Sequence, residues 1–187
     1  MNAEHLALCA GTEWAEQLQR TLLPWAFPNG TTEPSMLEVG PGPGAATEIL
    51  RSEAHHLTAL ELDPDLAAGL RSRFHNDPQV RIVRGDAAAL PFRDATFDTV
   101  ACFTMLHHLP NRAAQDRAMA EFARVLRPGG TLAGTDSLDS PGLRRLHDGD
   151  LLVPLDPLTL ADRLTAAGFD TADIAVLAFG VRFRAVA

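Results

Sequence analysis

Short strand-like runs alternate with helix-like runs over most of this chain of 187 residues. The strand-like runs lie at 36–39, 57–62, 79–85, 97–105 and 131–137. The helix-like runs lie at 45–51, 64–74, 113–126 and 156–169. Alternation at this spacing predicts an α/β fold, a mostly parallel sheet with helices on both faces.

The end of the chain breaks this rhythm. Runs 173–179 and 181–187 are both strand-like and are joined at Gly180, which leaves no room for a crossover helix. Two strands connected so closely must pair antiparallel. Before the alternation, apolar residues recur at helical spacing from Ala3 to Phe27, which predicts one helix, and "PNGTTEP" over 28–34 predicts a loop. The length favours a single domain.

Composition excludes several kinds of protein. The net charge of −8 argues against a nucleic-acid partner, because nucleic acids are usually bound by a basic surface. Every basic residue is arginine, so lysine Schiff-base chemistry is excluded. Cys9 and Cys102 are far apart, which predicts neither a disulfide framework nor a metal site and fits a reducing compartment. The first residues lack the pattern of a secretory signal, and no apolar run reaches the ~18 residues that span a bilayer, so we expect a cytoplasmic protein without membrane contact.

The loop "GPGPG" between the first strand-like run and its helix predicts a ligand site. Gly40, Gly42 and Gly44 let the backbone approach a ligand closely, and Pro41 and Pro43 stiffen the turn. The following helix offers free N–H groups and a partial positive charge. Ligands of open parallel sheets bind at this edge, outside the carboxyl ends of the strands.

Two cofactors fit the loop taken alone. Gly40, Gly42 and Ala45 match the dinucleotide pattern G-x-G-x-x-A, and Glu61 lies near the expected place of an acid on ribose hydroxyls. S-adenosylmethionine is the other cofactor. Glu38 favours it, because a carboxylate two residues before the loop can bind an ammonium group but would repel a pyrophosphate. Asp86 and the Ala87 amide, after the third strand-like run, can read an adenine edge, and the terminal antiparallel pair also favours it.

In this order and spacing, "LEVGPGPG", "LELDP", "GDAAALPF", "FDTVACFTMLHHL", "LRPGG" and the terminal strand pair resemble the class I S-adenosylmethionine-dependent methyltransferases, close to the small type 11-like group. The resemblance covers the chain from about Ser35 onward. It implies a Rossmann-like sheet of seven strands, the last of them antiparallel. It also implies a helical cap in 1–30, a cofactor-binding half in 35–136 and a substrate-side half in 137–187 of one methyltransferase domain.

The resemblance assigns the cofactor site residue by residue. Glu38 and the loop from Gly40 to Gly44 would hold the methionine end, Glu61 the ribose hydroxyls, and Leu62 would lie against the adenine. Asp86 and Ala87 would read the adenine edge. Phe103 and Thr104 would line the methyl-donor side. The expected cofactor residues are Glu38, Gly40, Pro41, Gly42, Gly44, Glu61, Leu62, Asp86, Ala87, Phe103 and Thr104.

The histidines supply the expected catalytic residues. His107 and His108 follow the fourth strand-like run, where either could act as a base or orient a substrate, and packing of one of them is the alternative. His5 lies in the first helix, which could cover the site, and Cys9 and Trp14 either form a lid or simply pack. His147 lies in "HDGD", which we expect to be a solvated turn rather than a metal site. No metal is expected.

The sequence therefore predicts methyl transfer from S-adenosylmethionine to a small-molecule acceptor, leaving S-adenosylhomocysteine. Alternatives are a non-catalytic cofactor-binding module and a nucleic-acid methyltransferase. The last is disfavoured because "FTMLHHLP" lacks the Asn/Asp-Pro-Pro-aromatic tetrapeptide of amino-methylating enzymes. The acceptor atom is not specified, and either a monomer or a homodimer is compatible with the sequence.

Overall fold

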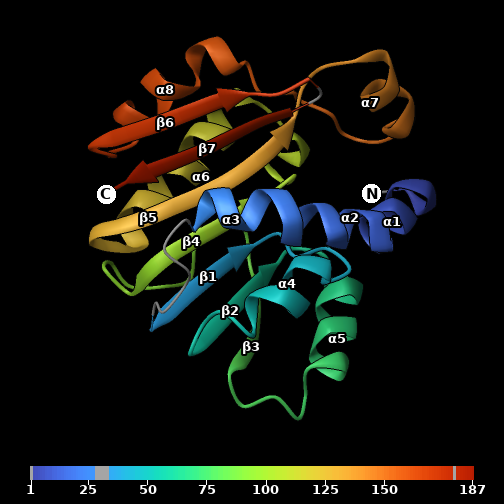
Figure 1. Cartoon of the computed structure of the whole chain (residues 1–187), viewed down its shortest axis with the longest axis vertical. Coiled ribbons are helices and arrows are strands. Elements are labelled where there is room, and N and C mark those ends of the chain that lie inside the picture. Colours follow the sequence, from blue (N-terminus) through green and yellow to red (C-terminus); the bar gives the residue numbers. More distant parts are fainter. Residues whose placement is uncertain (1, 28–33, 179) are drawn as a thin grey trace.

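The computed structural model describes residues 2–27, 34–178 and 180–187. The loop predicted over 28–34 lies almost wholly outside these residues, as does Phe179 at the end of a predicted strand. Within the described residues, seven strands form one sheet in the order β3-β2-β1-β4-β5-β7-β6 (Figure 1). The strands are β1 (Ser35–Val39), β2 (His56–Glu61), β3 (Val80–Arg84), β4 (Phe97–Phe103), β5 (Leu126–Ser137), β6 (Thr171–Val176) and β7 (Gly180–Val186).

The strand directions confirm the predicted fold class. The pairs β1–β2, β1–β4, β2–β3 and β4–β5 are parallel, whereas β5–β7 and β6–β7 are antiparallel. The order turns around between β1 and β4, and each of these strands is followed by a loop on the same edge of the sheet. In such a sheet, this switch point is where a ligand crevice opens.

The helices of the sheet begin at side-chain caps that the sequence supplies. Asp63, Asn111, Ser140 and Asp156 each accept hydrogen bonds from amides of the first turn, of α5, α6, α7 and α8 respectively. These helices are α5 (Pro64–Arg73), α6 (Arg112–Val125), α7 (Pro141–Leu146) and α8 (Pro157–Ala166), and α4 (Ala45–Leu50) follows the glycine loop. The sequence pattern predicts no helix between 137 and 155, so α7 is a helix that it missed.

The two faces of the sheet bury separate hydrophobic clusters, because successive residues of a strand point to opposite faces. Leu37 and Val39 of β1 pack with residues of α6 and α8, whereas Met36 packs with the N-terminal helices and α4. Cys102 is fully buried in the first cluster, as expected for a core residue. Glu38 shares the face of Met36, which places its carboxylate beneath the N-terminal helices.

The single N-terminal helix predicted over Ala3–Phe27 is wrong in detail. The segment forms α1 (Ala3–Cys9), α2 (Thr12–Gln17), the π-helix η1 (Leu18–Leu22) and α3 (Leu23–Ala26). The break occurs at Gly11, whose backbone is extended and which a side chain would crowd against the Leu8 carbonyl oxygen, 3.1 Å from an added Cβ. In Figure 1 these helices cross one face of the sheet above β1 and β4, and α1 extends toward α7.

A second correction concerns the end of α6. The sequence places 127–130 between a helix-like run and a strand-like run that begins at 131, but β5 already begins at Leu126, directly after α6. Leu126 pairs with Phe97, and the register then shifts before Thr131 pairs with Thr99. Gly129 takes a positive φ of 80° inside this irregular stretch. The predicted helix is therefore confirmed, but residues 127–130, which lie between the two predicted elements, belong to β5.

No helix in the described residues is long and apolar enough to cross a membrane.

Candidate functional site

A cavity of about 670 Å³ opens at the carboxyl ends of the central strands. Ten of the eleven expected cofactor residues line it: Glu38, Gly40, Pro41, Gly42, Glu61, Leu62, Asp86, Ala87, Phe103 and Thr104. Gly44 is the exception. An added Cβ at Gly44 would lie 2.6 Å from a Leu70 methyl carbon, so this glycine allows the loop to pack against α5. The predicted residues thus gather around one space, except for one that serves helix packing.

The glycine loop follows β1 in a conformation that ordinary side chains avoid. Gly40, Gly42 and Gly44 have φ values of 70°, 56° and 87°. The Gly40 amide donates to the Leu60 carbonyl oxygen at 2.9 Å, which ties the loop to β2. An added Cβ at Gly40 would come within 2.2 Å of the Met105 side chain. Glycine is therefore required at Gly40 by both backbone angle and space.

Glu38 is a buried acid at the base of the cavity. Its side chain is 2% exposed, and the Thr47 hydroxyl donates to its Oε2 at 2.7 Å. Burial raises the pKa of Glu38 to about 7, although the Thr47 hydrogen bond acts in the opposite direction. A cation entering the cavity would find a carboxylate that lacks a positively charged partner among the described residues.

We predict that Glu38→Gln stabilises the ligand-free protein at pH 8 by about 2–3 kcal/mol. The pKa of Glu38 is raised on folding, so its stabilising contribution is complete near pH 4 and is lost as pH rises through about 7. Glutamine stays neutral and can still accept from Thr47. Urea denaturation at pH 5 and pH 8 measures the effect, which should shrink at pH 5. Glu13→Gln, at an exposed site on α2, is the control, and equal stability of Glu38→Gln and the parent at both pH values would contradict the prediction.

Glu61, at the end of β2, lies against the glycine loop and lines the cavity. Its Oε2 accepts from the Gly42 amide at 3.0 Å, and its Oε1 accepts from the Asp63 amide at 2.9 Å. Burial raises the pKa of Glu61, and these amides partly offset that effect. The carboxylate retains free lone pairs on both oxygens, since each can accept more than one hydrogen bond. Glu61 therefore both shapes the loop and offers two acceptors to a ligand.

An apolar and an acidic residue form the next part of the wall. Leu62 is 62% exposed, which is unusual for leucine and leaves an apolar surface at the rim. Asp86 follows β3, is exposed, and accepts from the Ala88 amide through Oδ1 at 2.8 Å. Ala87 is buried beside it. A flat apolar ring with polar edges would find complementary groups here.

Backbone strain occurs where β4 leaves the sheet. Thr104 has a φ of 50°, a conformation that a β-branched residue rarely adopts. Its amide donates to the Thr135 carbonyl oxygen at 2.7 Å, which holds the strained residue in place. Phe103 and Thr104 both line the cavity. Strain of this kind is concentrated at functional sites, where surrounding structure maintains it.

The two expected catalytic histidines occupy different positions. Both lie in the 3-10 helix η2 (Leu106–His108) after β4. His108 is half-buried and lines the cavity, whereas His107 is 1% exposed and does not. The His107 Nδ1 lies 2.5 Å from Asp136 Oδ1, and its Nε2 lies 3.1 Å from His147 Nε2. Only His108 can touch a molecule in the cavity.

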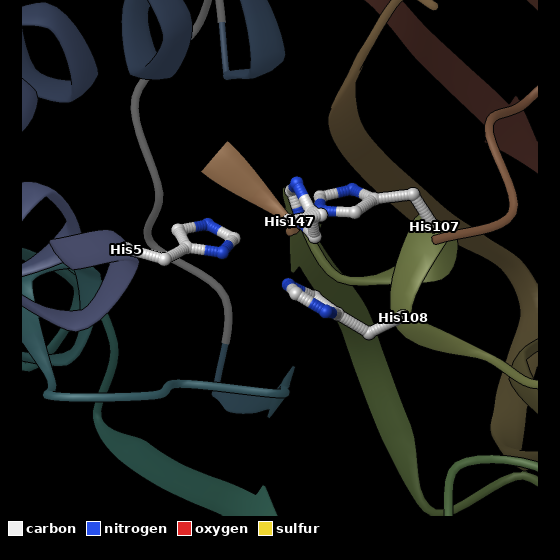
Figure 2. A group of neighbouring side chains, drawn as sticks. All are labelled: His5, His107, His108 and His147. Atoms are coloured by element: carbon white, nitrogen blue, oxygen red, sulfur yellow. The ribbon is translucent and has the colours of Figure 1, made fainter. Parts of the chain in front are cut away.

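Four histidines gather around His107 and His108, beside the cavity (Figure 2). His5 from α1, His107 and His108 from η2, and His147 at the end of α7 each place a ring nitrogen within 4.8 Å of the others. We refer to these four residues as the histidine cluster. The expectation that His147 lies in a solvated turn is wrong, because its side chain is 3% exposed and packs against the other rings. Burial lowers the pKa of His5 to about 4 and of His108 to about 2, and it also lowers that of His147.

A further part of the cavity wall comes from segments outside the sheet. Leu6 and Cys9 of α1 and Trp14 of α2 line the cavity. Cys9 and Trp14 therefore lie in a position that a lid over the cavity would require. Asp150 and Leu151, after α7, complete this wall and were not predicted. Asn2 anchors α1 there, since its amide donates to Asp150 Oδ2 at 2.5 Å and its Nδ2 to the Leu146 carbonyl oxygen at 2.7 Å. No local pattern marks contacts between residues about 145 positions apart.

Comparison with known proteins identifies relatives of this arrangement. A family model described as a methyltransferase domain matches residues 37–134, slightly more than half of the chain. The chain is 41% identical over 102 residues to a phthiotriol/phenolphthiotriol dimycocerosates methyltransferase from Mycobacterium ulcerans, covering 54% of this chain and 36% of that protein. It is 36% identical over 124 residues to ribosomal RNA small subunit methyltransferase A from Parasynechococcus marenigrum, covering 63% and 40%.

A solved structure extends the fold match to the whole chain. A methyltransferase from Aquifex aeolicus aligns with a TM-score of 0.76 at 15% identity, covering 100% of this chain and 98% of that one. At this identity the likeness concerns the fold alone. The chain spans well under half the length of the two curated relatives above.

Proposed function

Because the chain belongs to the methyltransferase domain family, which uses S-adenosylmethionine, we propose that it transfers a methyl group from this cofactor to a small organic acceptor. The family match favours S-adenosylmethionine over the dinucleotide that the glycine loop alone also permitted. The observation that carries the proposal is a pair of buried carboxylates. Glu38 and Glu61 both line the cavity beside the glycine loop.

The residues of the cavity fit the cofactor. Glu38 is buried without a cationic partner among the described residues, as a site for the ammonium of the methionine end requires. Glu61 offers two oxygens to ribose hydroxyls, and a nearby pyrophosphate would be repelled by Glu38. Leu62, Asp86 and the Ala87 amide provide the apolar surface and polar edge that suit adenine.

When bound, S-adenosylmethionine supplies a methyl group that its sulfonium already activates for displacement. The protein has to align an acceptor with that group and exclude water. We place the acceptor at the wall formed by Leu6, Cys9, Trp14 and His108, since this side of the cavity is not needed for the cofactor. His108 can orient an acceptor there by a hydrogen bond. His107 does not line the cavity and would not touch the acceptor.

The size of the cavity and the charge of the chain support a small acceptor. About 670 Å³ is within the usual range for small-molecule sites and must hold the cofactor as well. The net charge of −8 disfavours RNA as the acceptor, although one relative is named as a ribosomal RNA methyltransferase.

Calorimetric titration with S-adenosylmethionine, S-adenosylhomocysteine and NADH tests the cofactor. We expect saturable 1:1 binding of the first two and none of NADH. Binding of NADH alone would overturn the proposal. Incubation with methyl-labelled cofactor then tests the acceptor, with small-molecule extract and ribosomal RNA offered separately. Label in the RNA fraction would point to the nucleic-acid alternative, and binding without transfer to either fraction would favour the non-catalytic module.

A further inference from the structure

In the histidine cluster, ring nitrogens lie close to one another, and hydrogen bonds among the described residues do not account for these close contacts. His147 Nδ1 lies 2.8 Å from the Leu143 carbonyl oxygen, which can only accept, so this nitrogen carries the ring proton. His107 Nδ1 lies 2.5 Å from the Asp136 carboxylate and carries its proton for the same reason. In the neutral rings, both Nε2 atoms are then bare acceptors.

These two bare acceptors face each other at 3.1 Å. Two lone pairs at this distance repel unless something positive lies between them or beside them. Two nitrogens that bind one tetrahedral zinc ion at the usual Zn–N length of about 2.0–2.1 Å are about 3.3 Å apart. The spacing of His107 and His147 is therefore close to that of a metal-binding pair.

His5 provides a second, independent observation. Its side chain is 5% exposed, and its Nδ1 is buried without a hydrogen-bond partner among the described residues. Burial of an unpaired ring nitrogen is costly, and native structures rarely keep one without a reason. Figure 2 shows the His5 ring reaching from α1 toward the rings of His107, His108 and His147.

Asp136 completes the pattern expected around a metal. It is 1% exposed, accepts from the His107 amide at 3.2 Å and holds the His107 ring through Nδ1. Histidine ligands usually donate their second nitrogen to a carboxylate or a backbone carbonyl, which fixes the tautomer and the ring orientation. His107 and His147 show both forms, with Asp136 and the Leu143 carbonyl as partners.

We propose that His5, His107, His108 and His147 bind one divalent transition-metal ion of the zinc type. Imidazole nitrogens suit such ions, and all four candidate atoms lie within 4.8 Å, so shifts of about 1 Å would bring them to bonding distance. This departs from the expectation of no metal drawn from the sequence. This metal site does not rest on the proposed methyl transfer, but the two sites share His108, which also lines the cavity.

The proposal is tested with untagged full-length chain, stripped with a chelator and titrated with Zn²⁺ against a chromophoric competitor. We expect one Zn²⁺ per chain with a Kd below about 1 µM, and a rise in thermal midpoint on binding. Co²⁺ in its place should give visible absorption bands typical of a four-coordinate nitrogen site. These readouts do not depend on cofactor or acceptor, so a failure of the proposed methyl transfer leaves them unaffected.

Matched variants locate the site. His5→Gln and His147→Gln should each weaken Zn²⁺ binding at least about 100-fold, and Asp136→Asn should weaken it about 10–100-fold. The control is the double variant His55→Gln/His56→Gln, which removes an exposed pair of adjacent histidines and should retain full affinity. Circular dichroism of each stripped variant separates loss of the site from loss of the fold.

Two outcomes would overturn the proposal. One is a folded parent chain that binds no Zn²⁺ at 100 µM. The other is 1:1 binding whose affinity is unchanged in both His5→Gln and His147→Gln.

Discussion

Glu61→Ala is expected to weaken binding of S-adenosylmethionine and S-adenosylhomocysteine about 100-fold without unfolding the chain. The carboxylate offers two oxygens to the proposed ribose hydroxyls, and two hydrogen bonds to a charged group at the lower end of the usual range, about 1.5 kcal/mol each, correspond to about 100-fold. It also holds the Gly42 amide at 3.0 Å and the Asp63 amide at 2.9 Å, so its loss loosens the loop before any ligand binds.

Titration calorimetry on the variant and on a control measures this effect. Asp162→Ala removes an exposed carboxylate from α8, outside the cavity lining, and should bind like the parent. Asp86→Ala should weaken binding less than Glu61→Ala, because Asp86 is exposed whereas Glu61 is 7% exposed. Unchanged affinity in both Glu61→Ala and Asp86→Ala would remove the proposed placement of ribose and adenine.

Gly134→Ala is expected to have the largest effect on stability, a loss of about 3 kcal/mol or a failure to accumulate in folded form. Gly134 lies in β5, paired with Cys102 of β4 and Phe183 of β7. An added Cβ would lie 2.5 Å from the Cys102 carbonyl oxygen and 2.4 Å from the Phe183 ring. The ring can move, but the carbonyl oxygen belongs to the central sheet.

Chemical denaturation compares this variant with a substitution expected to act in the opposite direction. Gly69→Ala lies on the exposed face of α5, where an added Cβ meets nothing within 4 Å, and should stabilise by about 0.5–1 kcal/mol through helix propensity. If Gly134→Ala unfolds at the same denaturant concentration as the parent, the tight packing of β4, β5 and β7 is not what determines the residue at this position.

The parallel sheet and its ligand edge could be predicted because their signals are local. Each strand and helix is encoded by a continuous run, and the glycine loop, Glu38 and Glu61 lie within 25 residues of one another in the sequence. Strand alternation then decides which face a side chain meets. This is why ten expected cofactor residues line one cavity in the structure.

The histidine cluster could not be predicted in the same way. His5, His107 and His147 come from three segments that no periodicity connects, and His147 lies in a stretch rich in turn-forming residues. The break at Gly11 was also hidden, because apolar residues on both sides keep helical spacing. The cluster depends on how α1 and α7 approach each other, which the tertiary structure determines.

The two walls of the cavity have different origins in the chain. One is built from loops of the central sheet, and the other from α1, α2 and the residues after α7, which lie outside the sheet. Recombination could therefore exchange the second wall while leaving the first intact. A chimaera that carries those outer segments from another chain of this fold should show the acceptor preference of that chain and the cofactor affinity of the recipient. New specificities could then arise by exchange of peripheral segments alone.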